Sequence, residues 1–365
     1  MMDFIDLKKQ QEFIKEDLEA NIKTVLEHGK FIMGPEVKEL ENVLANYVGT
    51  KFCIGVSSGT DALLIALMAL DVKEGDEVIT TPFSFIATAE TILLLGAKPV
   101  FVDIDPKTYN IDPAKIEDKI TPKTKAIMPV SLYGQCADFD EINKIAQKYD
   151  LKVIEDGAQS FGATFKGKKS CSLSDIGCTS FFPSKPLGSY GDSGACFTNS
   201  EDLFDRMNSI RLHGQEKRYH HVRIGINGRI DTIQAAILLA KMKVFPKEVS
   251  LRAEVGNEYT KLFKKNGSKI QTPHIIEDTT SVFAQYTIEV SDRQKILDGL
   301  KDKGIPTAVH YPVPLHKQPI MDYMNLSCPI SERASLRVMS LPMHPYLSEE
   351  DQAYVVKNIT KLVRD

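Results

Sequence analysis

Apolar residues near the start of the chain recur at intervals of three and four positions, which is the spacing of one face of an α-helix. These positions are Phe13, Ile14, Leu18, Ile22, Val25 and Leu26. Gly29 follows His28, where such a helix is expected to end. A second helix is predicted after the sequence GPEV, because Pro35 suits a first helical turn.

Between Lys51 and Asn199 the pattern changes to short runs rich in β-branched and aromatic residues. The runs are KFCIGV, EVITTPFSF, KPVFVDI, KAIMPVSLYG, LKVIED, GCTSFFP and GACFTN. They alternate with helical stretches such as DALLIALMAL and DEINKIAQKYD. This alternation predicts an α/β fold with a mainly parallel sheet covered by helices on both faces. Active groups are then expected where strands end and helices begin.

The second half of the chain predicts a further unit. The sequence NGRIDTIQAAILLAKMKVF, from Asn227, has the pattern of a long helix that leads away from the sheet. The residues after it carry their own mixture of strands and helices. We therefore predict N-terminal helices and a large domain over residues 1–245, and a smaller C-terminal α/β domain over residues 246–365.

Charge and composition narrow the classes of partner. The net charge of −4 has both signs interspersed, so no basic surface for nucleic acid or for an anionic membrane is expected. The longest apolar run, Ala62 to Leu70, is too short to cross a bilayer, and the start has no secretion signal. We expect a cytoplasmic protein whose partners are small molecules or proteins.

Metal binding is not expected from the cysteines or the histidines. The six cysteines are scattered without ligand spacing and are interpreted as reduced, mostly buried residues. His213, His220 and His221 lie close in sequence, but adjacent histidines on an extended chain point to opposite faces. No carboxylate recurs at ligand spacing beside them.

The segment Ser57-Ser58-Gly59-Thr60-Asp61 closes a predicted strand and opens a predicted helix. Its backbone N–H groups and hydroxyls could hold a phosphate at the positive end of the helix dipole. The alternative is an ordinary helix N-cap, in which a hydroxyl satisfies the first N–H groups.

The run KVIEDGAQSFGA places Asp156 at the end of a predicted buried strand. A buried carboxylate needs a cationic partner, and a protonated pyridine nitrogen would serve. Gln159, three residues further on, could reach a hydroxyl of the same ring. The alternative is an acid that caps the following turn.

The run SFFPSKPLGSYGDSGA places Lys185 at the end of an apolar stretch, before a glycine-rich turn. A partly desolvated lysine loses its proton more easily, and its amine can then react with an aldehyde. Ser180 and Ser184 offer hydroxyls for a phosphate. The alternative is a lysine that extends its ammonium into water.

These features together meet the requirements of one cofactor. A phosphate cradle, a buried acid and an aldehyde-reactive lysine at successive strand ends are what pyridoxal 5′-phosphate (PLP) requires. The motifs SSGTDAL, EDGAQSFGA and SFFPSKPLGSYGDSGA resemble those of the DegT/StrS-type sugar aminotransferases. The resemblance extends over nearly the entire chain, as far as AVHYPVPLHKQP and SLPMHPYL, and implies the fold type I of PLP-dependent transferases, that of aspartate aminotransferase.

The resemblance also implies roles around the cofactor. Lys185 would bond to the cofactor aldehyde, Asp156 would pair with the pyridine nitrogen, and Gln159 would contact the 3′-hydroxyl. The phosphate would be held by Gly59, Thr60 and Ser180. Phe85 occupies the position of an aromatic ring that stacks on the cofactor, where close relatives often have tyrosine.

Further implied roles concern a second subunit and the substrate. In similar enzymes the segment GINGRID reaches the neighbouring subunit's site, so Asn227 would contact that phosphate and the protein would be a homodimer with shared active sites. Arg229, His310 and Tyr311 are candidates for binding the sugar nucleotide. Phe31 could lie against the uridine or the sugar, although a core aromatic is its simpler interpretation.

The reaction implied by the resemblance is a transamination. L-Glutamate would give its amino group and leave as 2-oxoglutarate, and C3 of a UDP-linked 3-keto sugar, UDP-2-acetamido-2-deoxy-3-oxo-D-glucuronate, would receive it. The product would serve bacterial surface polysaccharide (O-antigen, lipopolysaccharide) biosynthesis. The alternatives are another 3- or 4-keto deoxysugar nucleotide as substrate, or a non-catalytic sugar-nucleotide sensor.

Two further classes are disfavoured by particular residues. In the related cofactor-dependent sugar dehydratases a histidine replaces the reactive lysine, whereas this chain has Lys185. A Rossmann dehydrogenase would need a GxGxxG motif after a predicted strand, which the sequence lacks.

Overall fold

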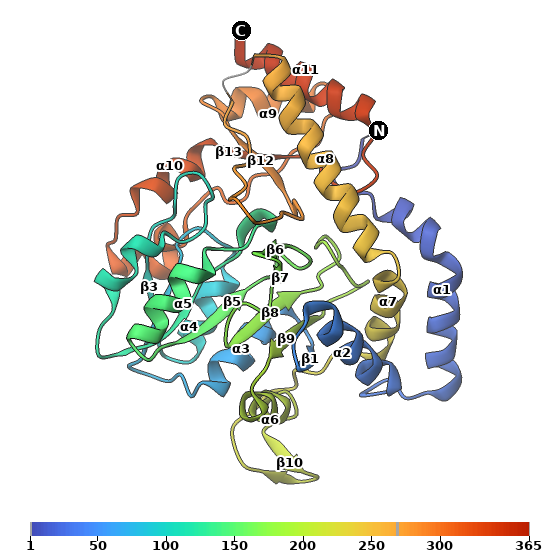
Figure 1. Ribbon diagram of the computed structural model, residues 1–365, viewed down its shortest axis with the longest axis vertical. Coiled ribbons are helices and arrows are strands. Elements are labelled where there is room, and N and C mark those ends of the chain that lie inside the picture. Colours follow the sequence, from blue (N-terminus) through green and yellow to red (C-terminus); the bar gives the residue numbers. More distant parts are fainter. Residues whose placement is uncertain (1, 268–269, 365) are drawn as a thin grey trace.

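The computed structural model describes residues 2–267 and 270–364. Its centre is a seven-stranded sheet with the order β1-β9-β8-β5-β4-β2-β3 (Figure 1). The strands are β1 (Phe52–Val56), β2 (Glu77–Thr80), β3 (Lys98–Phe101), β4 (Thr124–Met128), β5 (Lys152–Asp156), β8 (Ile176–Ser180) and β9 (Gly194–Thr198). Neighbouring strands are parallel, except that β9 runs antiparallel to both β1 and β8. The predicted mainly parallel sheet is thus confirmed.

Helices cover the sheet on both faces, as the alternating pattern predicted. One face carries α3 (Gly59–Ala69), α4 (Ala87–Leu94) and α6 (Glu201–Ile210), and the other carries α2 (Pro35–Val48), α5 (Phe139–Lys148) and α7 (Thr232–Met242). Successive strand residues divide between the two faces, as a pleated strand requires: Ile154 packs with the α3 core and Val153 with the α5 core.

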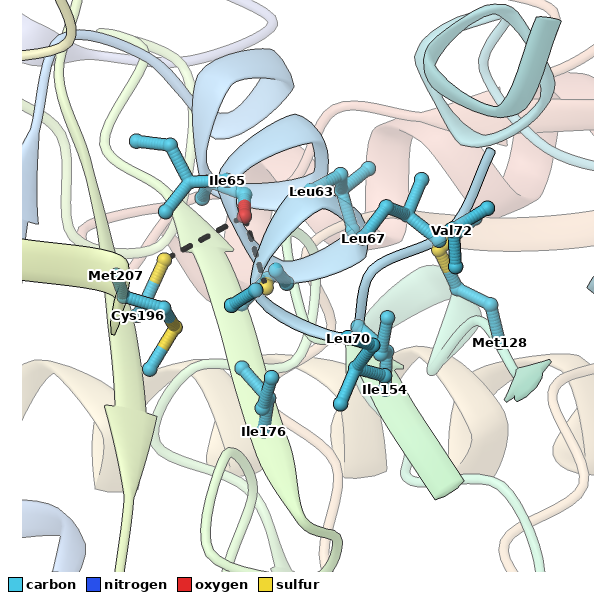
Figure 2. Packing of buried hydrophobic residues seen from close by; sticks show 14 of the residues in the cluster. Leu63, Ile65, Leu67, Leu70, Val72, Met128, Ile154, Ile176, Cys196 and Met207 are labelled. Carbon is cyan, nitrogen blue, oxygen red and sulfur yellow. Dashed lines mark hydrogen bonds between the residues drawn. The ribbon is translucent and has the colours of Figure 1, made fainter. Parts of the chain in front are cut away.

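A hydrophobic core lies between α3 and the sheet, next to the strand ends at which the sequence predicts the active groups. Figure 2 shows Leu63 and Leu67 of α3 above the sheet residues Met128, Ile154 and Ile176. The thiols of two further sheet residues, Cys178 and Cys196, each donate to the Ala62 carbonyl at 3.4 Å. The core therefore fixes the first turns of α3 against β8 and β9.

The C-terminal part of the chain builds a second core at one end of the molecule (Figure 1). An antiparallel pair of short strands packs there against three helices. The elements of this part are α8 (Phe245–Lys265), β12 (Tyr286–Glu289), α9 (Arg293–Lys301), α10 (Pro329–Arg337), β13 (Val338–Leu341) and α11 (Glu349–Arg364). Helix α1 (Leu7–His28) runs beside α7 (Figure 1).

The remaining elements are short. The strands are β6 (Thr164–Phe165), β7 (Lys168–Lys169), β10 (Gln215–Lys217) and β11 (His220–His221), and the 3₁₀ helices are η1 (Pro113–Lys115), η2 (Glu117–Lys119), η3 (Leu132–Gly134), η4 (Leu315–Lys317) and η5 (Pro319–Met324). The β10–β11 hairpin projects at the end of the molecule opposite α11 (Figure 1). Across the described residues, we find no helix with both the length and the apolar character needed to cross a membrane.

Two helix boundaries differ from those predicted. The first helix starts at Leu7 rather than near Phe13, because Asp6 caps it by accepting from the backbone N–H of Lys9 at 2.9 Å. The helix predicted from Asn227 begins only at Thr232. The residues before it are extended because their backbone forms bridges to other segments, among them the one between Arg229 and Val56.

Candidate active site

The carboxyl ends of three strands meet at one edge of the sheet. Strands β5 and β8 are parallel, and β1 and β8 both run antiparallel to β9, so β1, β5 and β8 end on the same side. Ser57 and Ser58 follow β1, Asp156 ends β5 and Ser180 ends β8. The order and direction of the strands therefore bring together the three segments that carry the sequence motifs.

The start of α3 approaches the end of β8 very closely. A Cβ atom on Gly59 would lie 2.6 Å from the Cβ of Ser180, so a larger residue would not fit without a shift of one segment. Ser58 caps the helix by accepting from the Asp61 N–H at 3.0 Å, which is the ordinary role weighed for this motif. The N–H groups of Gly59 and Thr60 remain at the positive end of the helix, where an anion such as phosphate binds well.

Asp156 is buried and held by two hydrogen bonds. Its Oδ2 accepts from the Thr88 hydroxyl of α4 at 2.8 Å, and its Oδ1 accepts from the Ala158 N–H at 3.2 Å. Burial raises the pKa of Asp156, whereas the Thr88 hydroxyl, the Ala158 N–H and the charge of Lys185 oppose that rise. A cation placed beside this carboxylate would offset the cost of burying it.

Lys185 lies in a tight turn after β8. Its backbone N–H donates to the Phe182 carbonyl at 2.8 Å, and Gly188 is required because a Cβ there would collide with the Pro183 carbonyl oxygen. Burial lowers the pKa of the Lys185 ammonium, and the charge of Asp156 opposes that shift. The amine is therefore more readily deprotonated than that of a lysine extended into water, and it lies within electrostatic reach of the acid.

A hydrogen-bonded chain extends from Gln159 to the C-terminal part of the molecule. The Oε1 of Gln159 accepts from the Tyr133 N–H at 2.8 Å, and its Nε2 donates to the Tyr311 hydroxyl at 3.0 Å. The Tyr133 hydroxyl donates to the carbonyl of His310. Burial, and then the charge of Lys185, lower the pKa of His310 to about 4, so its ring is neutral at pH 7.

Aromatic rings line the approach to these polar groups. The ring of Phe85 is 55% exposed, and its centroid lies 6.5 Å from that of Tyr311. A hollow of about 490 Å³ opens here. Its lining includes Phe85, Tyr311, Pro312, Val313, Gln318 and Ile320. A planar ring and an attached sugar have room beside Phe85.

The residues expected to reach a neighbouring subunit lie next to the phosphate cradle. The Ser57 N–H donates to the Gly228 carbonyl at 3.0 Å, and Arg229 pairs with Val56 in a backbone bridge. The Nε of Arg229 is buried without a hydrogen-bond partner in the described part of the chain. The side chain of Asn227, in contrast, is exposed.

Phe31 lies on the connection between α1 and α2. It is exposed, and its carbonyl accepts from the Thr232 N–H at 3.0 Å at the start of α7. The simpler interpretation of a core aromatic is wrong, because the ring is at the surface, and a role toward the substrate stays a prediction.

The residues fit PLP. The α3 start suits its phosphate, the buried Asp156 suits a protonated pyridine nitrogen, and Lys185 offers an amine with a lowered pKa. Across the described residues, no group of three or more histidine, cysteine or acidic side chains could hold a metal ion.

Comparison with protein families decides the identity of this site. The model of the DegT/DnrJ/EryC1/StrS aminotransferase family matches residues 12–360. The chain belongs to this family. It is 58% identical over 347 residues to the UDP-2-acetamido-2-deoxy-3-oxo-D-glucuronate aminotransferase of Pseudomonas aeruginosa, covering 95% of this chain and 96% of the relative. It is 44% identical to a pleiotropic regulatory protein of Geobacillus stearothermophilus, covering 99% and 98% of the two chains.

Solved structures confirm the fold and the cofactor of this aminotransferase family. A DegT DnrJ EryC1 StrS aminotransferase from Brucella abortus superposes with a TM-score of 0.94 at 39% identity, covering all of both chains. NtdA from Bacillus subtilis, solved with the bound cofactor PMP, superposes with a TM-score of 0.91 at 36% identity, covering 99% of this chain and 83% of that one. The predicted PLP-dependent aminotransferase of fold type I is confirmed.

The sequence did not reveal three residues that support the site. Thr88 holds Asp156, Tyr133 holds Gln159, and Ser340 lies 3.0 Å from the His310 ring nitrogen. Each partner is at least 26 positions away along the chain. Thr88 lies three residues after Phe85, the one residue of the segment PFSFIATAE that the sequence singles out.

Proposed function

We propose that this chain transfers the amino group of L-glutamate to C3 of UDP-2-acetamido-2-deoxy-3-oxo-D-glucuronate, on the route to a bacterial surface polysaccharide such as O-antigen. The 58% identity to the Pseudomonas aeruginosa relative over almost the whole of both chains supports this substrate. The pairing of Lys185 with Asp156 at the strand ends supports the chemistry.

When bound, PLP supplies an aldehyde that can exchange amino groups and a conjugated ring that can accept an electron pair. Asp156 would keep the pyridine nitrogen protonated, because a buried carboxylate is a strong partner for that cation. The Nζ of Lys185 would hold the cofactor, and the lowered pKa of this amine would suit it to carry a proton to and from the reacting carbon.

We assign the other site residues by their positions. Gly59, Thr60 and Ser180 would hold the phosphate at the start of α3. Gln159 would contact the ring hydroxyl, and Phe85 would lie against the ring. Arg229 is the candidate for a substrate carboxylate, because its guanidinium is planar and its buried Nε lacks a partner among the described residues. His310 and Tyr311 line the sugar side of the site.

We infer that the functional unit is a homodimer with shared active sites. Asn227 is exposed on the segment that follows the β10–β11 hairpin, where it could reach a second copy's phosphate. We also place the reaction in the cytoplasm. The six cysteines lie buried as free thiols, which suits a reducing compartment.

The decisive experiment is mass spectrometry of products from purified protein, L-glutamate and a panel of UDP- and dTDP-linked keto sugars. Amination of UDP-2-acetamido-2-deoxy-3-oxo-D-glucuronate, faster than of the other sugars, is the expected result. Preference for another 3- or 4-keto sugar nucleotide would overturn the substrate and leave the aminotransferase intact.

A regulatory role is the second candidate, because one relative is named a pleiotropic regulatory protein. A sensor needs no aldehyde-reactive lysine or ring-protonating acid, whereas this chain has Lys185, Asp156 and Gln159 together. Protein that stays colourless after incubation with PLP and turns over none of the sugars would favour the sensor.

A further inference from the structure

A second acid lies next to Asp156 but faces the other side of the sheet. Glu155 precedes Asp156 on β5, and successive side chains of a strand point to opposite faces. Its side chain is fully buried. The proposed reaction assigns it no role, although burying a carboxylate is costly.

Neutral donors alone hold the Glu155 carboxylate in the described part of the molecule. Its Oε1 accepts from the Ser131 hydroxyl at 3.0 Å and from the Ser170 hydroxyl at 2.7 Å, and its Oε2 accepts from the Cys171 N–H at 2.7 Å. No ion pair joins Glu155 to a lysine, arginine or histidine of residues 2–267 and 270–364. The neighbouring titratable groups are Asp156 on its own strand and the thiols of Cys136 and Cys171.

Two of the three donors, the hydroxyls of Ser131 and Ser170, connect Glu155 to segments that carry groups of the active site. The Ser170 hydroxyl also lies 2.7 Å from that of Ser160, the residue after Gln159. Ser131 lies two residues before Tyr133, whose N–H holds the Gln159 side chain. The Tyr133 hydroxyl in turn reaches His310. The Glu155 carboxylate is thus connected through these hydrogen bonds to the turn that contains Tyr133 and to the turn that contains Gln159.

We propose that Glu155 is a positioning residue of the cofactor site: its carboxylate joins the turns at residues 131–133 and 157–160 and so sets the place of the Gln159 amide. The inference rests on the proposed contact between Gln159 and the cofactor. Burial raises the pKa of Glu155 to about 7, and the hydrogen bonds from Ser170, Cys171 and Ser131 oppose that rise. The hydrogen bonds that its oxygens accept, rather than an ion pair, therefore position the two turns.

The test compares Glu155→Met with Glu155→Gln in the full chain. In Gln, the amide oxygen can still accept from the Cys171 N–H, and the serine hydroxyls can rotate to accept from the amide nitrogen. In Met, all three donors lose their acceptor. Titration of the apo-protein with PLP, followed by absorbance, is expected to show Kd raised about tenfold or more for Met and within about threefold of wild type for Gln.

Hydrogen exchange of the apo-proteins gives a readout that is independent of activity. Glu155→Met should exchange faster than Glu155→Gln in residues 131–137 and 157–172, because both segments lose their common anchor. Wild-type affinity and exchange in Glu155→Met would overturn the inference. A Gln variant as weak as the Met variant would also overturn it, because the charge would then matter and not the acceptors.

Two further experiments distinguish a failure of this inference from a folding defect and from a failure of the proposed function. If Glu155→Met does not fold, Ser170→Ala removes one donor and should raise the Kd of PLP about threefold or more. Ser174→Ala is the matched control and should leave the Kd unchanged. Its hydroxyl accepts from the Glu155 backbone N–H and donates to the Ile176 carbonyl, and it forms no hydrogen bond with the Glu155 carboxylate. If Gln159→Ala leaves the Kd of PLP unchanged, the proposed contact between Gln159 and the cofactor is wrong. If Gln159→Ala weakens PLP binding while Glu155→Met and Ser170→Ala do not, only the positioning role of Glu155 is wrong.

Discussion

Lys185 and Asp156 each alter the proton affinity of the other. Burial acts in opposite directions on their two pKa values, because it disfavours the charged form of both groups. Their mutual attraction opposes both shifts. The pair therefore keeps an amine that can be deprotonated next to an acid that can hold a cation.

Replacement of Lys185 by alanine is expected to abolish attachment of the cofactor and to lower turnover by at least about a thousandfold, because one amine both binds and transfers a proton. Borohydride reduction followed by peptide mapping should label Lys185 in the wild type. The circular dichroism of the variant should match the wild type, since the side chain is not part of the core. Label on another lysine would contradict the assignment.

The sequence singled out these residues but not the residues that surround them. Lys185, Asp156 and Gln159 stand out because lysine, acid and amide are unusual at the ends of apolar strands. Thr88 and Tyr133 could not be found in this way. Their contacts depend on how distant turns pack together, and a lone threonine or tyrosine carries no local signal of that packing.

At the scale of elements, the strands were predicted well and their ends were not. The predicted run EVITTPFSF covers β2 but continues past Thr80, where the structure leaves the sheet. β-Branched residues favour a strand wherever they occur, whereas the end of a strand depends on its neighbours. The helix predicted from Asn227 was too long for the same reason: Arg229 and Asp231 have backbone partners on other segments.

The close approach of α3 to β8 makes a prediction for Gly59. In Gly59→Ala the new methyl group must displace Ser180 or the helix start, which should cost about 1–3 kcal/mol of unfolding free energy. Because the same groups form the cradle, the Kd for PLP should rise about tenfold or more. Urea denaturation and absorbance titration measure the two effects, and an unchanged Kd would contradict the cradle.

Helix α7 contacts the Lys185 turn through a second buried lysine. The Nζ of Lys241 lies 4.3 Å from the centroid of the Tyr190 ring and has no hydrogen-bond partner in the described part of the chain. Burial lowers its pKa to about 8, and the charge of Glu248 opposes that shift. The native state therefore binds fewer protons than the unfolded state between about pH 8 and 10, where stability should rise with pH.

Lys241→Met should increase the free energy of unfolding at pH 7 by about 1–3 kcal/mol, because it removes a charge that is costly to bury. It should also flatten the rise in stability between pH 8 and 10. The control is Lys243→Met, whose exposed ion pair with Asp17 should matter by less than about 0.5 kcal/mol. Denaturation at several pH values measures both variants, and a less stable Lys241→Met at pH 7 would contradict this account.

At the scale of the whole molecule, apolar residues remain exposed near the projecting hairpin. Tyr219 is 79% exposed and Ile224 is 82% exposed. Asn227 lies on the same segment. The proposed homodimer would cover these residues.

The division into residues 1–245 and 246–365 stays a prediction. The buried residues of the second core all lie in the second of these two parts.

A mixture of Lys185→Ala and Asn227→Ala chains tests the shared site. In a hybrid dimer one site would combine an intact lysine with an intact asparagine from the other chain. Random exchange of equal amounts should restore about a quarter of the wild-type activity, although each variant alone is nearly inactive. Mass spectrometry of intact dimers confirms the exchange, and no recovery despite exchange would contradict shared sites.

The bond between Ser57 and Gly228, and the pairing of β1 with β9, bring an early segment of the chain against a late one. During translation the first half of the cradle leaves the ribosome long before its partner segments exist. A nascent chain halted before Gly194 would therefore have no place to retain vitamin B6. Loading of the enzyme must wait until most of the polypeptide has been synthesised.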